Sequence, residues 1–178
     1  LQTWLALPEA REDDPAAFTH LARSALPELE GEGKAVRLIL GSAWGETVPM
    51  AMPSEVFYAD AVLAAGAAIP LPEDHEDRGV YVLEGEVSCA GQVFQAGRML
   101  VFRPGDRISV KAGETGARLM LLGGATMGGP RFIWWNFVAS SRDRIEAAKE
   151  AWRAGDWPHG RFRLPRGVDG DFISAPER

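Results

Sequence analysis

Three histidines and one cysteine are the side chains of this 178-residue chain best suited to bind a metal or act as a nucleophile. His20, His75 and His159 lie far apart, with neither i, i+4 nor H-x-H spacing. A transition-metal site requires donor atoms that converge on one point. We therefore expect each histidine to be a surface or hydrogen-bonding residue. Cys89 has no sequence signal of a low-pKa environment, so we interpret it as structural.

Acidic residues flank His75 on both sides and form the strongest alternative metal site. Their carboxylates could bind a hard cation, but we favour a solvated acidic loop that precedes a strand. The four residues are Glu73, Asp74, Glu76 and Asp77.

Motifs for other chemistries are missing from the chain. It contains no G-x-S-x-G nucleophile elbow and no P-loop. The glycine pairs Gly123-Gly124 and Gly128-Gly129 lack a dinucleotide-binding pattern and the strand–helix–strand context that it needs.

Composition narrows the class of protein further. The net charge is −6 and the arginines are scattered, which argues against direct nucleic-acid binding. No run of 18 apolar residues and no signal-peptide pattern is present, so we expect no membrane span. With Cys89 as the only cysteine, no intrachain disulfide is possible, and we expect a reducing, cytoplasmic setting. The first residue is Leu1, not Met, which indicates a fragment or a processed product.

Short apolar runs alternate with glycine-rich and charged breaks from Lys34 to Gly123. This pattern predicts an all-β sandwich or barrel. We expect hairpins at Glu84-Gly85-Glu86 and at Ala90-Gly91-Gln92. The predicted strands are Val36–Leu40, Phe57–Leu63, Val80–Leu83, Val87–Cys89, Val93–Gln95, Met99–Phe102, Ile108–Val110 and Leu119–Leu122.

One helix is predicted, from Ser140 to Ala154. Ser140 and Asp143 fit a capping pattern, and Gly155 provides a C-terminal stop. Ile145, Ala148 and Trp152 fall on one face of this helix. A weaker helical stripe follows Asp14-Pro15, but we interpret that stretch as an irregular or strand-like linker.

The region from Gly66 to Ile108 resembles the paired motifs of the cupin fold, an RmlC-like jelly roll. Gly66, Gly85, Gly97 and Arg103-Pro104-Gly105 match its turn residues. The positions of the three histidine ligands hold Pro72, Asp74 and Ile108, and the position of the glutamate holds Arg78. Proline and isoleucine offer no side-chain donor, and arginine is a fixed cation. We therefore expect a barrel without a metal.

Three segments together resemble bacterial pirin-like proteins, which are two-domain cupins. Leu1–Pro8 is similar to the end of their first domain, and Leu71–Val87 is similar to their second-domain core. The aromatic run Gly129–Val138, followed by the helix up to Trp152, is similar to their C-terminal tail. The resemblance implies that residues 1–33 are the end of a preceding cupin plus a linker. It also implies a metal-free C-terminal cupin at 34–124, and an aromatic tail at 125–178 that docks on the barrel or on a partner domain.

The family resemblance implies a metal, usually iron, in the N-terminal cupin, whose motif this chain does not contain. It implies that the complete protein is a metal-dependent quercetin 2,3-dioxygenase or a redox-linked regulator, and that this chain alone is not the catalyst. The alternative is a stand-alone, metal-free cupin that binds a protein or a small apolar ligand. We predict an interface with the missing N-terminal cupin, or with a second chain in a homodimer, at Trp134, Trp135, Phe137 and Trp152. Plain core packing is the competing role for these rings.

Overall fold

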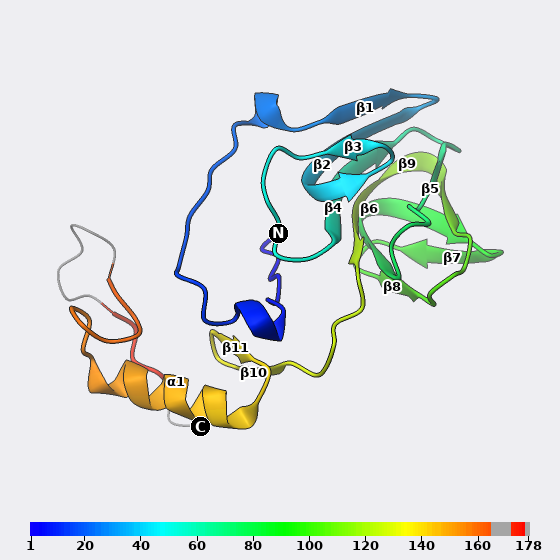
Figure 1. Cartoon of the computed structure of the whole chain (residues 1–178). Helices are drawn as coiled ribbons and strands as arrows, with labels where there is room; N and C mark the ends of the chain where they lie inside the picture. The colour runs from blue at the N-terminus through cyan, green and yellow to red at the C-terminus, as the bar shows by residue number, and fades with distance from the viewer. Residues whose placement is uncertain (165–171, 177–178) are drawn as a thin grey trace. The chain divides into compact units, whose positions relative to one another are not determined.

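The computed structural model describes residues 1–164 and 172–176, which fall into two compact units (Figure 1). One unit is Pro15–Thr126 and contains nearly all of the strands. The other combines Leu1–Asp14 with the described residues from Met127 onward. The sequence did not predict that the N-terminal segment groups with the tail.

Nine strands of the Pro15–Thr126 unit form one antiparallel sheet, which confirms the prediction of an all-β cupin-type fold. The hydrogen-bonded order is β1-β2-β4-β9-β6-β7; β3 pairs with β2, β5 with β9, and β8 with β6. A short 3-10 helix at Arg23–Ala25 precedes the sheet. The strands are β1 (Glu28–Gly31), β2 (Lys34–Ala43), β3 (Glu46–Thr47), β4 (Val56–Leu63), β5 (Ala68–Pro70), β6 (Asp77–Cys89), β7 (Gln92–Gln95), β8 (Met99–Phe102) and β9 (Ser109–Gly124).

The core of this unit follows from the two-residue period of its strands. Alternate residues of β4 point inward, from Phe57 to Leu63, while the residues between them are only partly covered. Leu119 and Leu121 of β9 face them from the neighbouring strand and are fully buried. Complete burial of a ring such as Phe57 contributes about 1.5–3 kcal/mol.

All eight predicted runs lie within or at the edge of strands, but the structure joins four of them into two. Val80–Leu83 and Val87–Cys89 are both parts of β6, and β9 contains Leu119–Leu122 and most of Ile108–Val110. The hairpin predicted at Glu84-Gly85-Glu86 is therefore wrong. Gly85 lies inside β6, with φ +75° and a register shift beside it, so this glycine marks a bulge.

Two-residue turns connect several strands, and the one predicted at Ala90-Gly91 is confirmed. Cys89 pairs with Gln92, so Ala90 and Gly91 form the turn, with φ of +49° and +78°. Glu32-Gly33 and Trp44-Gly45 form equivalent turns that we did not predict. Both residues of such a turn adopt positive φ, which favours glycine at the second position.

An ion pair between β4 and β9 makes the stability of the sheet depend on pH. Arg118 donates to both carboxylate oxygens of Asp60, at 3.0 and 2.8 Å, and this contact lowers the pKa of Asp60. A lowered pKa contributes stability above the unfolded-state pKa, and that stability is lost as the pH falls through the folded-state pKa.

Replacing Asp60 with Asn is therefore expected to reduce the free energy of unfolding at pH 7 by about 0.5–1 kcal/mol, a range set by the pair's partial exposure. The difference from the wild type should shrink as the pH falls below about 4. Urea unfolding at several pH values measures both effects. Glu114→Gln, which removes an exposed carboxylate from β9, is the matched control. A deficit of Asp60→Asn that stayed constant down to pH 2.5 would contradict the linkage.

The second unit contains a short hairpin and the only helix of more than three residues among those described. Its elements are a 3-10 helix (Glu9–Arg11), β10 (Phe132–Trp134), β11 (Phe137–Ala139) and α1 (Arg142–Ala154). Ile145 and Ala148 of α1 are buried, as predicted, and Gly155 ends the helix with φ +66°. The N-cap is Ser141, whose Oγ accepts from the Arg144 amide at 3.3 Å. The prediction of Ser140 as the cap is wrong by one residue.

Glu12 explains why the N-terminal segment belongs to this unit. Its side chain is only 7% exposed and lies 3.6 Å from Arg131 and 3.1 Å from Arg144. Ser140 donates its hydroxyl to the same carboxylate at 2.7 Å. Leu1–Pro8 belongs to no strand in the described residues. Residues 15–22 form no helix.

Candidate functional site

The turn residues of the cupin frame adopt the conformations that their positions require. Gly66, Gly85, Gly97 and Gly105 have φ between +71° and +85°, a region that favours residues without a Cβ atom. Gly66 precedes β5, Gly97 precedes β8, and Gly105 lies between β8 and β9. The scaffold that would position ligands in a metal-binding cupin is therefore retained in this barrel.

Arg78 occupies the glutamate position of this frame, near the start of β6. Its side chain is buried, with a total exposure of 2%. One terminal nitrogen donates to the Pro72 carbonyl at 3.3 Å. The other donates to the carbonyls of Asp106, at 2.7 Å, and Arg103, at 3.4 Å. Arg78 thus ties the loop before β6 to the loop between β8 and β9.

His75 is the residue of this region that sequence reasoning misplaced. Only 3% of it is exposed, so the prediction of a solvated loop is wrong for His75, although its four acidic neighbours are exposed. Its Nε2 lies 2.8 Å from the Ser42 carbonyl and therefore donates, since a carbonyl can only accept. Its ring packs against Phe57 with centroids 4.8 Å apart. This burial depends on contacts distant in the sequence, so the local pattern carried no signal of it.

The other frame positions bring no further donors together. Pro72 is buried, Ile108 packs against the core, and Asp74 is exposed. His20 and His159 are both exposed. Among residues 1–164 and 172–176, no three His, Cys, Asp or Glu side chains are grouped in a way that could hold a metal ion.

Cys89 is a buried thiol at the end of β6, and burial raises the pKa of that thiol. A raised pKa keeps the sulfur protonated, and the thiolate is the nucleophilic form. This environment agrees with the interpretation of Cys89 as structural.

The four aromatic residues predicted to form an interface lie together in the second unit. Trp135 packs edge-on against Trp152 at 5.4 Å, and Phe137 stacks on Trp134 at 6.0 Å. Trp157, Phe162 and Phe172 extend the same cluster. The cluster rings from Trp134 to Phe162 are half-buried, whereas Ile133, which precedes Trp134, is 66% exposed. The rings therefore serve first as the small core of their own unit.

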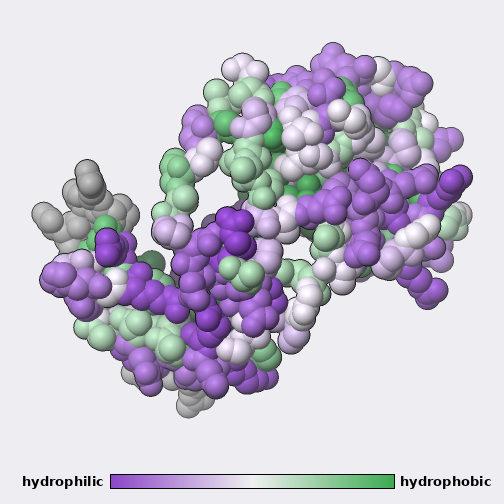
Figure 2. All heavy atoms as spheres, viewed as in Figure 1, coloured by the Kyte–Doolittle hydropathy of each residue, from purple (hydrophilic) through white to green (hydrophobic). Residues whose placement is uncertain are grey.

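Charged residues of α1 cover part of this aromatic cluster. The Lys149 ammonium lies 4.5 Å from the centroid of Trp134, within range of a cation–π interaction. Arg142 lies similarly over Phe132, at 4.8 Å. Figure 2 shows hydrophilic and hydrophobic residues interleaved on the face in view. Within the described residues, no helix is long and apolar enough to cross a membrane.

Comparison with known proteins places this arrangement in a family. Residues 58–158 match the pirin C-terminal cupin domain. A pirin-like protein from Caulobacter vibrioides is 41% identical over 178 residues, which cover 99% of this chain and 59% of that protein. Pirin-1 from Arabidopsis thaliana is 27% identical over 83% of this chain and 54% of its own length.

A solved structure shows the same fold. The crystal structure of a quercetin 2,3-dioxygenase from Acinetobacter baumannii superposes with a TM-score of 0.82 at 27% identity. The superposition covers 97% of this chain and 56% of that protein. The chain thus spans somewhat more than half the length of the relatives that it matches, and the part matched is their C-terminal half.

Proposed function

Because this chain belongs to the pirin family through its C-terminal cupin domain, we propose that it is the metal-free barrel of a two-cupin protein. In this proposal the other barrel binds the metal, and the complete protein is a dioxygenase of the quercetin 2,3-dioxygenase type or a redox-linked regulator. Support comes from the A. baumannii enzyme and from the length of the relatives, which leaves room for a preceding domain.

The observation that carries the metal-free assignment is the buried guanidinium of Arg78. The cupin motif that this frame resembles has a glutamate at this position, and a fixed cation there repels a metal ion. The Arg78 terminal nitrogens are already bonded to loop carbonyls at 2.7–3.4 Å. The residues present therefore do not fit a metal.

The role of the aromatic cluster follows from the same proposal. The outer side of this unit would contact the first barrel or a second copy of the chain. That side would be formed by Trp134, Trp135, Phe137 and Trp152, together with exposed Ile133. Aromatic residues of this kind often dominate the binding energy of interfaces. Slower amide exchange of β10 and α1 in the longer protein than in this chain alone is the expected sign of docking.

Metal analysis of this chain and of the longer natural protein tests the proposal. Intact mass of the natural protein first establishes whether residues precede Leu1. We expect less than 0.1 equivalent of iron, zinc, nickel or copper on this chain. We also expect about one equivalent on the longer protein if residues with an H-x-H motif precede Leu1, and we expect this metal to be lost when the histidines of that motif are replaced with alanine. One tightly bound metal ion per 178-residue chain would overturn the assignment.

A second function, a cupin that binds a small apolar ligand, is favoured by one further observation. A largely apolar cavity of about 380 Å³ opens in the barrel unit, beside Trp44. Ligand sites typically have volumes of about 300–1,000 Å³ and mainly apolar walls.

A further inference from the structure

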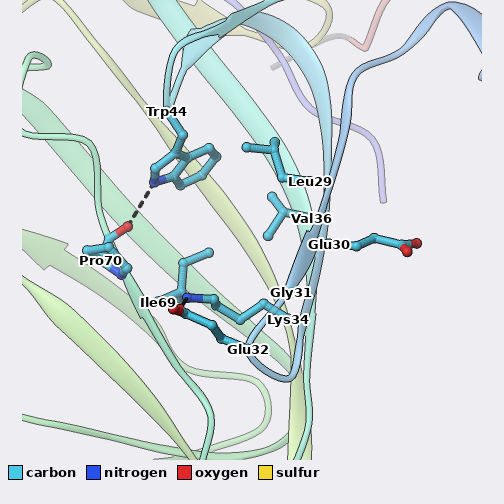
Figure 3. Close-up of a pocket in the computed structure, with 9 residues that line it drawn as sticks. All are labelled: Leu29, Glu30, Gly31, Glu32, Lys34, Val36, Trp44, Ile69 and Pro70. Carbon is cyan, nitrogen blue, oxygen red and sulfur yellow. Dashed lines mark hydrogen bonds and ion pairs between the residues drawn. The ribbon is translucent and has the colours of Figure 1, made fainter.

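The cavity beside Trp44 lies between the β1–β2 hairpin, the β2–β3 turn and β5 (Figure 3). Leu29 and Val36 point from the hairpin toward the indole of Trp44, and Ile69 and Pro70 of β5 form the opposite wall. Glu30 points away from the cavity. The walls are thus mainly apolar, with one aromatic ring, and the charged side chains of Glu32 and Lys34 also line the cavity.

Trp44 holds this position at an energetic cost. It is the first residue of the two-residue turn between Ala43 and Glu46, with φ +51°. A residue other than glycine in this conformation costs roughly 1–2 kcal/mol, and Asn, Asp or Gly is usual there. Glu32 and Ala90 adopt the same conformation in the two equivalent turns, so the turn itself imposes this strain on Trp44.

The indole of Trp44 is fixed in place by two contacts. Its Nε1 donates to the Pro70 carbonyl at 3.0 Å, and its ring packs edge-on against Phe57, with centroids 5.9 Å apart. Because the N–H group is already bonded to Pro70, the indole can offer a ligand only its aromatic surface. The ring is therefore suited to contact a second aromatic ring.

Lys34 supplies the cation of this cavity. Its ammonium donates to Glu32 at 2.6 Å. The Glu32 side chain is 83% exposed and that of Lys34 only 21%. An exposed ion pair contributes only about 0–1 kcal/mol, so a ligand carboxylate can share or displace Glu32 at little cost. A lysine ammonium also has three N–H donors, which can serve two acceptors.

We propose that this cavity binds a small aromatic carboxylate, with its ring against Trp44 and its carboxylate on Lys34. The proposal deepens the second function above, and it does not depend on the first barrel or on a metal. It goes beyond an apolar ligand because it assigns the ligand a negative charge and a planar ring.

The test is titration of the chain with 2-naphthoate and with the neutral 2-naphthamide, monitored by calorimetry. We expect saturable 1:1 binding of naphthoate. Lys34→Met, which keeps most of the aliphatic stem, should weaken the binding of naphthoate at least tenfold and that of naphthamide less than threefold. Lys111→Met, an exposed lysine of β9 that does not line the cavity, should leave both unchanged. Trp44→Asn, which keeps a residue suited to the turn, should weaken both ligands at least tenfold.

Three outcomes would overturn the proposal. They are the absence of saturable naphthoate binding up to millimolar concentration, equal losses for the acid and the amide in Lys34→Met, and unchanged binding in Trp44→Asn. Circular dichroism checks that each variant is folded. If Trp44→Asn does not fold, the acid–amide comparison in Lys34→Met decides alone. Failure here would leave the metal analysis above unaffected, so the two proposals fail separately.

Discussion

Replacing Gly41 with Ala is expected to lower the free energy of unfolding by about 3 kcal/mol, through left-handed strain and overpacking together. Gly41 lies in β2 opposite Phe57, with φ +70°. A Cβ atom at this position would lie 1.7 Å from the backbone carbonyl oxygen of Val56. Backbone atoms of a central strand pair cannot yield as a flexible side chain can, so β2 and β4 would have to separate.

Gly91→Ala separates the two causes of this loss. Gly91 has nearly the same backbone conformation, with φ +78°, but a Cβ atom there meets nothing within 4 Å. This control should lose only the conformational part, about 1 kcal/mol. Urea or thermal unfolding of both variants measures the difference. Equal losses in the two variants would show that the close approach of Gly41 to Val56 contributes nothing.

The strands could be predicted from the sequence because their burial follows a local two-residue period. β4 and β9 carry alternating apolar side chains, and β8 was predicted with the bounds observed. The short strands β1, β3 and β5 could not be predicted. Glu28–Gly31 and Glu46–Thr47 contain too few apolar residues to show a period, and Ala68–Pro70, with three residues, is too short to show one. These segments are strands because they pair with neighbouring strands, and not because of their own residue pattern.

The candidate site was only partly predictable for a related reason. The frame glycines and the residues at the cupin ligand positions could be identified from the sequence, because motif spacing is a property of the sequence alone. The burial of His75 and the fixed position of the Trp44 indole were not, since each depends on a distant partner, Ser42 for His75 and Pro70 for Trp44. The grouping of the N-terminal segment with the tail likewise depends on Glu12 meeting Arg131 and Arg144.

Replacing Arg78 with Met is expected to lower the free energy of unfolding by about 2–3 kcal/mol. Methionine retains most of the volume but leaves the carbonyls of Pro72, Arg103 and Asp106 without their shared donor. Hydrogen bonds from a charged group contribute about 1.5–3 kcal/mol each. Removing a buried cation offsets part of that loss, and the Arg78 Nε is itself buried without a partner in the described residues. Because the substitution removes three hydrogen bonds and only one unpaired N–H group, we expect a net loss of stability.

Arg78→Lys tests whether the site needs the guanidinium of Arg78 as a link between the loops or needs only a positive charge. Lysine keeps the cation but not the planar fork that reaches both loops, so it should recover less than half of the lost stability. Arg98→Met, at an exposed position, should stay within about 0.5 kcal/mol of the wild type. Hydrogen exchange should accelerate at residues 72–76 and 103–107 in Arg78→Met, because the guanidinium is what joins these loops. Full rescue by lysine, or exchange changes confined to other parts of the barrel, would show that Arg78 does not act as this link.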